Sequence, residues 1–382
     1  MLQQKFKDKK ISLVLSGGAV KAAAYHLGVA KALYEQKIYP DFFIGSSAGS
    51  IVSTYLAADI PLDELIYAYT TSTSFFSKKK VPYHPISYFD MLGISPIKKI
   101  TSFGKSNSMW SYVDPSLIAK RFHPTRLFKV DGLFNTNGIE SYFKKLPFNF
   151  GDDFKYLKKH LYIVATELNR PHKAVFCSNL LNSSSPETTY YNDVPISKAI
   201  AASCAIPFLY EPVTIKHGNG ESIVYTDGEV RDTLSTNIAI DLDADIIISS
   251  YTHQPISFSR NNRSLSNFGA PALITQALYQ VIEKKISHQR QLFELQKNVI
   301  DSIFQSCKKQ NLSDDIFNSI VMELEKNLSF NKNREFYWIH PKSSNLKMFF
   351  GDHFSLSKRQ VKFFIETGYI DAQQKINTSL NT

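Results

Sequence analysis

The sequence predicts a three-layer α/β fold in which helices cover both faces of a central, mostly parallel sheet. Residues 11–15 form a short β-rich apolar run, and helical spacing of Ala, Leu and Val follows over residues 21–36. Residues 41–44 form a second strand, which a glycine separates from an apolar helical segment at 48–56. Two strand–turn–helix units in succession indicate parallel strands covered by helices.

The rest of the chain predicts an elaborated domain followed by a helical region. We expect an α/β domain over residues 1–260, with an inserted cap at about 72–126, and a mainly helical C-terminal region over 261–382 that packs on it. The elements expected after the insertion are strands at 161–167, 174–176, 223–225, 246–250 and 336–340, a hairpin turn at 218–220, and helices at 271–307, 314–327 and 357–376.

Composition narrows the class of protein only in part. The chain has 382 residues, of which 43% are hydrophobic and 20% charged, which is ordinary for a folded protein of one large or two modest domains. Its net charge of +10 suits nucleic acid, an anionic membrane or an acidic partner, and charge alone does not choose among them. Since no nucleic-acid-binding pattern accompanies the charge, we do not expect nucleic-acid binding.

The cysteines and the N-terminal residues indicate in which cellular compartment the protein is expected. Cys177, Cys204 and Cys307 have neither metal-ligand spacing nor the number and spacing of a disulfide framework, which favours a reducing compartment. Residues 1–10 are polar and lead into an apolar run too short for a signal peptide or a membrane span. We therefore expect a cytoplasmic or peripheral membrane protein, although secretion without a cleavable signal leaves no readable pattern.

The insertion mixes lysines with aromatic residues. It contains Lys78 to Lys80 and Lys98-Lys99 among several Phe, Tyr and Trp residues. Two interpretations remain open: a solvated loop with scattered aromatics, or a cap that faces a membrane, where basic and aromatic residues both suit the interface.

The strongest chemical signal is Gly45-Ser46-Ser47-Ala48-Gly49, which fits G-x-S-x-G between a predicted strand and a predicted helix. The sharp turn crowds the backbone around the central residue, so small residues are needed two positions before and two positions after it. Only Ser47 has glycine at both positions. Ser47 is therefore a candidate nucleophile, and the helix behind it directs its positive end toward developing negative charge.

A second signal is the loop Ser16-Gly17-Gly18-Ala19-Val20-Lys21 after the first strand. Small residues at a helix N-terminus expose consecutive N–H groups that suit an anion, such as the oxyanion formed when a serine attacks an ester. The spacing matches neither a P-loop nor a dinucleotide-binding turn, and a tight turn without a ligand is the remaining alternative.

These blocks together resemble the patatin-like phospholipase family. The residues that carry the resemblance are the segment from Leu15 to Val29, Gly45 to Gly49, Asp227-Gly228, and Ala201-Ala-Ser-Cys-Ala-Ile-Pro207, which follow the order of the family's motifs. The resemblance spans about residues 11–251. The whole set is much more specific than any one motif.

The resemblance implies roles for six residues. Ser47 would be the nucleophile and Asp227 its sole base, with the amides near Gly17, Gly18 and Ala19 forming the oxyanion hole. Lys21 would hold the loop or steer an anionic head group. On its own, Asp227-Gly228 would be read as a turn.

The chain departs from the family pattern at two places. In the glycine-rich loop, Ala19 stands where the family has a third glycine and Ala22 where a glycine often follows the basic residue; a positive φ at Ala19 would cost roughly 1 kcal/mol or more. Glu229 stands where the family commonly has Gly or Ala, so a second carboxylate is expected near the site. Ser203 and Cys204 lack the context of a nucleophile and are expected to be packing residues.

By resemblance, the expected activity is that of a lipid acyl hydrolase of the phospholipase A or lysophospholipase type, with a phospholipid or acyl-lipid substrate. The alternatives are a soluble esterase or thioesterase with the same Ser–Asp dyad, and an inactive lipid- or protein-binding module on this scaffold. No metal or cofactor is expected, the membrane surface would be anionic, and the sequence does not reveal whether a protein partner activates the enzyme. A hidden triad would require a downstream histidine, and the candidates are His253, His288, His340 and His353.

Overall fold

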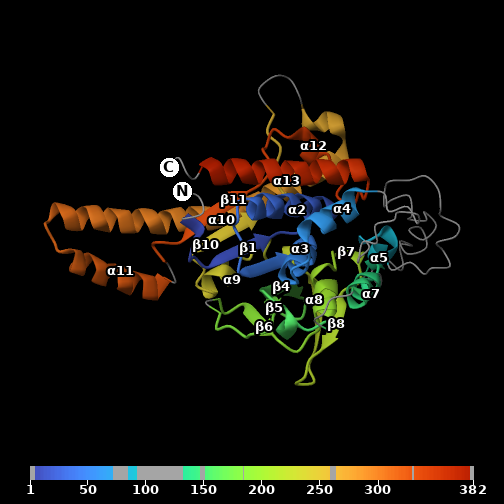
Figure 1. Ribbon diagram of the computed structural model, residues 1–382, viewed down its shortest axis with the longest axis horizontal. Coiled ribbons are helices and arrows are strands. Elements are labelled where there is room, and N and C mark those ends of the chain that lie inside the picture. Colours follow the sequence, from blue (N-terminus) through green and yellow to red (C-terminus); the bar gives the residue numbers. More distant parts are fainter. Residues whose placement is uncertain are drawn as a thin grey trace.

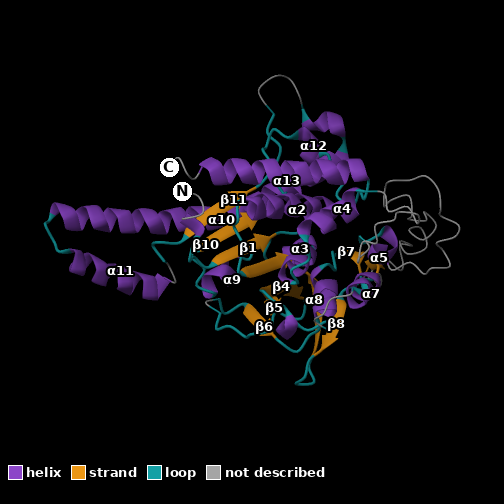
Figure 2. Ribbon diagram, in the orientation of Figure 1, coloured by secondary structure: helices purple, strands orange, loops and turns teal. Residues whose placement is uncertain are grey.

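The computed structural model describes residues 5–71, 85–92, 132–146, 151–183, 185–258, 264–328 and 331–378. Its centre is a twisted sheet with helices on both sides, and a helical C-terminal region follows (Figures 1 and 2). The predicted three-layer fold class is confirmed. Most of the predicted insertion lies outside the described residues, and so do both of its lysine clusters.

The main sheet is mostly parallel. Along one path its strands run in the order β11-β10-β1-β2-β4-β5-β6, and β9 pairs with both β4 and β8. The path is parallel throughout except between β4 and β5. The strands are β1 (Ile11–Leu15), β2 (Phe42–Ser46), β4 (His160–Glu167), β5 (Lys173–Phe176), β6 (Thr188–Tyr191), β8 (Val213–Lys216), β9 (Ser222–Asp227), β10 (Ile246–Ser250) and β11 (Glu335–Ile339), with β3 (Gly132–Phe134) and β7 (Phe208–Tyr210) in a separate pair.

The central strands are apolar because both faces of the sheet are covered. All five residues of β1 are buried; Leu13 packs into the core on one face and Val14 into the core on the other. Helices α2, α3, α8 and α13 build the first face, and α9 with the first part of α10 builds the second. The helices are α2 (Ala19–Glu35), α3 (Ala48–Ala57), α4 (Leu62–Thr70), α5 (Tyr88–Leu92), α7 (Asn137–Lys145), α8 (Ile196–Ser203), α9 (Thr236–Asp241), α10 (Ala270–Lys309), α11 (Asp314–Leu328), α12 (Leu346–Phe349) and α13 (Lys358–Thr378).

Two glycines let the closing helix α13 lie directly against α2, as Figure 1 shows. A Cβ on Gly28 would stand 1.9 Å from the backbone oxygen of Ile365, and a Cβ on Gly368 would stand 2.1 Å from that of Tyr25. Since α2 begins in the glycine-rich loop, this contact joins the C-terminus of the chain to the helix that carries the loop.

The long helix α10 packs on the sheet only through its first part. Tyr279 and Ile286 are buried against the body, whereas Ile300 packs with Val321 of α11. Beyond the body the two helices form an arm that projects from the molecule (Figure 1). Along the arm α10 packs against α11 through Ile300, Val321, Phe293 and Phe317, while other apolar side chains of the two helices, such as Leu295 and Met322, are exposed.

Candidate active site

Ser47 occupies a sharp turn between β2 and α3. Its backbone has φ 50° and ψ −125°, a region that L residues rarely adopt and that functional sites tolerate. A Cβ on Gly45 would stand 2.4 Å from the backbone oxygen of Gly49, and a Cβ on Gly49 would stand 2.2 Å from that of Leu15. The expected need for glycine on both sides of Ser47 is confirmed, because backbone occupies the space of each missing side chain.

Strand β4 brings Asp227 to Ser47. β2 runs parallel to β4 and ends with Ser46 opposite Val164, while β9 runs antiparallel to β4 and ends with Asp227 opposite Ala165. The ends of β2 and β9 therefore meet along one edge of β4, and residues 180 positions apart become neighbours. The Ser47 hydroxyl donates a hydrogen bond to Asp227 Oδ2 at 2.5 Å.

The surroundings of Asp227 make it a stronger base than an ordinary carboxylate. Its side chain is buried, and burial raises its pKa to about 6. Its other oxygen accepts the N–H of Glu229 at 2.8 Å, which holds the carboxylate in place. With this pKa, Asp227 is ionised at neutral pH and is well placed to accept the Ser47 proton.

Ser203 holds the backbone of Ser47, a contact that the sequence pattern did not reveal. Ser203 Oγ accepts the Ser47 N–H at 2.8 Å and donates to the backbone oxygen of Val164 at 2.6 Å. Ser203 is buried at the end of α8, so it supports the turn and makes no contact that would activate its hydroxyl as a nucleophile. The only sequence signal for this role was its place in the segment ahead of Asp227.

The glycine-rich loop lies directly against the candidate nucleophile. A Cβ on Gly17 would stand 2.7 Å from Ser47 Cβ. Gly18 has φ 122° and Ala19 has φ 55°, so Ala19 does adopt the unfavourable conformation considered from the sequence. The amides of Gly18 and Ala19 donate to no other described residue, whereas the Gly17 amide donates to Glu229 Oε1 at 2.6 Å.

Lys21 is fully buried, which rules out direct steering of an anionic head group. Its Nζ contacts Tyr279 Oη at 2.7 Å, His353 Nε2 at 3.0 Å and the backbone oxygen of Met348 at 3.3 Å. Burial lowers the pKa of Lys21 to about 7. Of the two roles implied by the resemblance, only holding the loop fits, since Lys21 ties the start of α2 to α10 and to the segment after α12.

Glu229 brings the expected second carboxylate into the site. Its Oε1 accepts from the Gly17 amide and from the Ser46 hydroxyl, and its Oε2 lies 3.9 Å from His253 Nδ1. Burial and then the charge of Asp227 raise the pKa of Glu229 well above its ordinary range. His253 therefore lies beside Glu229, whereas the Asp227 carboxylate accepts hydrogen bonds from the Ser47 hydroxyl and the Glu229 amide.

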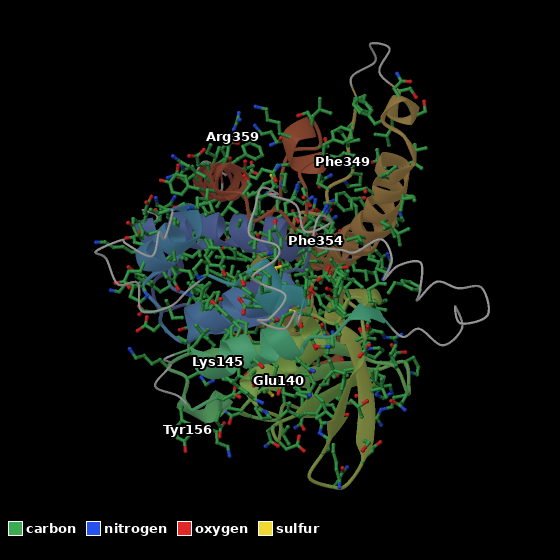
Figure 3. All side chains as sticks on the ribbon, turned by 90° about the vertical axis from the view of Figure 1, so that its right-hand side faces the viewer. Glu140, Lys145, Tyr156, Phe349, Phe354 and Arg359 are labelled. Carbon is green, nitrogen blue, oxygen red and sulfur yellow. The ribbon has the colours of Figure 1, made fainter. Side chains whose placement is uncertain are left out.

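An apolar cavity opens beside Ser47. Ala19 and Ser47 are among the residues that line it, and the space between atoms there, with the open solvent at its mouth included, is about 720 Å³. Ile86 and Met91, from the described part of the insertion, line it too. Another lining residue, Phe354, lies in the middle of the face shown in Figure 3, below Arg359 of α13 and above Glu140 of α7. The remaining lining residues are mainly apolar: Val20, Ala23, Ala24, Leu27, Ala48, Ile51, Val52, Tyr55, Tyr69, Ile139, Cys204, Ile206, Tyr210, Leu356 and Val361.

The comparison with known protein families matches residues 13–240 to the patatin-like phospholipase model. The matched range holds the glycine-rich loop, Ser47 and Asp227. The chain belongs to the patatin-like phospholipase family. As a patatin-like protein it is a member of a family of lipid acyl hydrolases.

This patatin-like chain matches two known proteins, both at low sequence identity. It is 26% identical over 220 residues to triacylglycerol lipase SDP1L of Arabidopsis thaliana, an alignment that covers 56% of this chain and 22% of the lipase. The chain thus matches about a fifth of the length of that relative. The crystal structure of VipD from Legionella pneumophila overlaps with 97% of this chain and 67% of its own at 14% identity, with a TM-score of 0.39, a likeness too weak to bear on function.

Within the described residues, no three His, Cys, Asp or Glu side chains are grouped so that they could hold a metal ion. None of the described helices combines the length and the apolar character needed to cross a membrane.

Proposed function

We propose that this patatin-like protein cleaves fatty-acyl esters of phospholipids, as a phospholipase A or lysophospholipase, through an acyl intermediate on Ser47. The observation that carries the proposal is the 2.5 Å hydrogen bond from Ser47 to Asp227 beside an apolar cavity. The serine has a base within reach of its proton, and the apolar lining of the cavity suits an acyl chain.

In the acylation step, Ser47 Oγ attacks the ester carbonyl carbon while its proton passes to Asp227. The carbonyl oxygen becomes an oxyanion, which accepts N–H bonds from the glycine-rich loop at the N-terminus of α2. Collapse of this intermediate breaks the bond to the alcohol oxygen, which takes the proton from Asp227. The fatty-acyl group is then esterified to Ser47.

Deacylation uses the same two residues. A water molecule attacks the acyl carbon as Asp227 accepts its proton, and the second tetrahedral intermediate collapses with that proton returning to Ser47 Oγ. The fatty acid leaves and the starting state is restored. Because Asp227 acts as base and then as acid in each half-reaction, a pKa of about 6 suits both tasks near neutral pH.

The substrate part of the proposal depends on the cavity and on the charge of the chain. Leu27 of α2, with Ile51 and Val52 of α3, provides an apolar wall for the acyl chain. The net charge of +10 favours an anionic membrane surface, where the enzyme would act as a peripheral protein from the cytoplasmic side.

The test is lipidomic comparison of wild type and Ser47→Ala on mixed liposomes, together with labelling by a fluorophosphonate probe. We expect free fatty acid and lysophospholipid from the wild type alone, and label on Ser47 alone. Labelling with turnover of soluble esters or thioesters but not of liposomes would make the protein a soluble esterase or thioesterase. The absence of both label and turnover would make it a binding module on this scaffold.

A further inference from the structure

The side chain of Glu229 turns back from the end of β9 onto the glycine-rich loop. Glu229 lies in a 3-10 turn, Gly228–Val230, which directly follows Asp227. A Cβ on Gly17 would stand 2.6 Å from Glu229 Cγ and 2.7 Å from Ser47 Cβ. Gly17 is therefore held between the candidate nucleophile and the Glu229 side chain.

Glu229 occupies a hydrogen-bond donor that an oxyanion needs. Its Oε1 accepts the Gly17 amide at 2.6 Å and also accepts the Ser46 hydroxyl. An oxyanion hole binds its oxygen with N–H donors at about 2.7–3.1 Å. A side-chain oxygen already fills that position at Gly17, so an ester oxygen reaches only the amides of Gly18 and Ala19 while Glu229 stays in place.

Three features oppose the contact that holds Glu229 on the loop. The Glu229 side chain is 16% exposed, its Oε2 is buried without a hydrogen-bond partner in the described part of the chain, and the carboxylate of Asp227 is close by. Burial of an acid with one unpaired oxygen opposes the two hydrogen bonds that hold it.

A second position for the carboxyl group is near. His253 Nδ1 lies 3.9 Å from Glu229 Oε2 and has no partner among the described residues, and the neighbouring Thr252 Oγ1 is buried and unpartnered in the same ranges. Burial and then the charge of Lys21 lower the pKa of His253 to about 3, so the ring is neutral. A rotation of Glu229 that brings its Oε2 closer to His253 Nδ1 would pair two atoms that now lack partners among the described residues and would release the Gly17 amide.

We propose that Glu229 is a built-in inhibitor of the oxyanion hole: its carboxyl group takes the place of the substrate oxyanion on the Gly17 amide and has to move before the tetrahedral intermediate forms. This inference depends on the proposed function, since it concerns the same acyl transfer at Ser47. Its consequence is that the native enzyme is slower than its Ser47–Asp227 geometry allows.

The experiment compares wild type, Glu229→Ala, Glu229→Gly and Glu229→Gln on a soluble short-chain ester, with Glu221→Ala on the exposed hairpin turn as the matched control. Loss of one oxyanion-hole donor lowers kcat by about 10²–10³, so we expect kcat to rise about tenfold or more in the Ala and Gly variants with little change in KM. Glu229→Gln keeps an acceptor oxygen for the Gly17 amide and should remain well below them. Glu221→Ala should match the wild type.

A tetrahedral inhibitor provides the second measurement. A trifluoromethyl ketone forms an oxyanion adduct with a serine nucleophile, so its inhibition constant should fall in proportion to the rise in kcat for Glu229→Ala and Glu229→Gly. A merely structural role would not produce this match.

The outcomes separate the two proposals. Unchanged or lower kcat in folded Glu229→Ala and Glu229→Gly, with Ser47 still labelled by a fluorophosphonate, would overturn the inhibitory role and leave the proposed function intact. If neither wild type nor variants react with the probe or hydrolyse an ester, the proposed function itself is wrong, and the inference falls with it.

Discussion

Replacing Asp227 with asparagine separates the proposed chemistry from the stability of the fold. Asparagine has nearly the same shape as aspartate and can accept one of the two hydrogen bonds that Asp227 receives from Ser47 and from the Glu229 amide. It cannot take the serine proton at neutral pH. The substitution therefore removes the base and leaves the buried volume unchanged.

The structure determines the sign of the stability change. Because the folded-state pKa of Asp227 is raised from 3.8 to about 6, its carboxyl group contributes stability below pH 3.8 that is lost as the pH rises through about 6. The folded and unfolded pKa values differ by about 2 units, and each unit corresponds to about 1.4 kcal/mol, so the loss is complete at pH 8 and amounts to about 3 kcal/mol. A lost hydrogen bond offsets about 1 kcal/mol of it. We expect Asp227→Asn to unfold with a free energy equal to that of the wild type or up to about 2 kcal/mol higher at pH 8, with the difference shrinking toward pH 4.

The activity should change far more than the stability. Because Asp227 is the described residue that accepts the hydrogen bond of the Ser47 hydroxyl, Asp227→Asn should lose activity almost as fully as Ser47→Ala, on the order of 10⁴–10⁶-fold. The assays are urea unfolding at both pH values and hydrolysis of one short-chain ester. The four alanine variants of the candidate histidines, His253, His288, His340 and His353, are measured beside them and should each keep most of the activity.

Two results would refute the dyad. One is retention of more than a tenth of the wild-type activity by Asp227→Asn. The other is a single histidine variant that is well folded yet as inactive as Ser47→Ala, because that would establish a triad.

Three further predictions concern the pH dependence of the reaction, the packing of α2 and the membrane surface. The kcat/KM for a soluble ester should fall about tenfold per pH unit below pH about 6 and level off above it, because Asp227 acts as the carboxylate; a flat profile down to pH 4 would contradict this. Gly28→Ala should lower the free energy of unfolding by about 1–3 kcal/mol or more, because its Cβ would stand 1.9 Å from a backbone oxygen of α13. Gly218→Ala, whose nearest contact would be 3.7 Å away, is the control, and equal melting temperatures for the two variants would refute the packing argument. Charge reversal at Lys78 to Lys80 and at Lys98-Lys99 should weaken salt-sensitive binding to anionic liposomes more than it lowers turnover of a soluble ester; equal binding of the wild type to neutral and anionic vesicles at low salt would contradict the membrane proposal.

Much of the fold could be predicted because its signals are local. The β1–α2 and β2–α3 units, the hairpin between β8 and β9, and the closing helix α13 all lie near their expected positions. Strand–turn–helix periodicity and turn residues act over a few positions, so one sequence is enough to locate them. Helices α10 and α11 also lie near their expected positions, but their packing against each other as an arm could not be predicted, because an amphipathic stripe does not show what packs on it.

The sequence by itself determined which chemical groups the site contains: a serine between two glycines at a strand end, a loop of small residues at a helix start, and an Asp-Gly pair after a strand. Tertiary structure alone decided how these groups meet. The ends of β2 and β9 face each other because both strands pair with β4, a register that no local pattern records. Burial, likewise, is a property of the folded chain. Lys21 contacts α10 in the interior, Ser203 accepts the backbone N–H of Ser47, and Glu229 accepts the Gly17 amide. Each of these contacts joins residues more than 150 positions apart, so no local pattern reveals it.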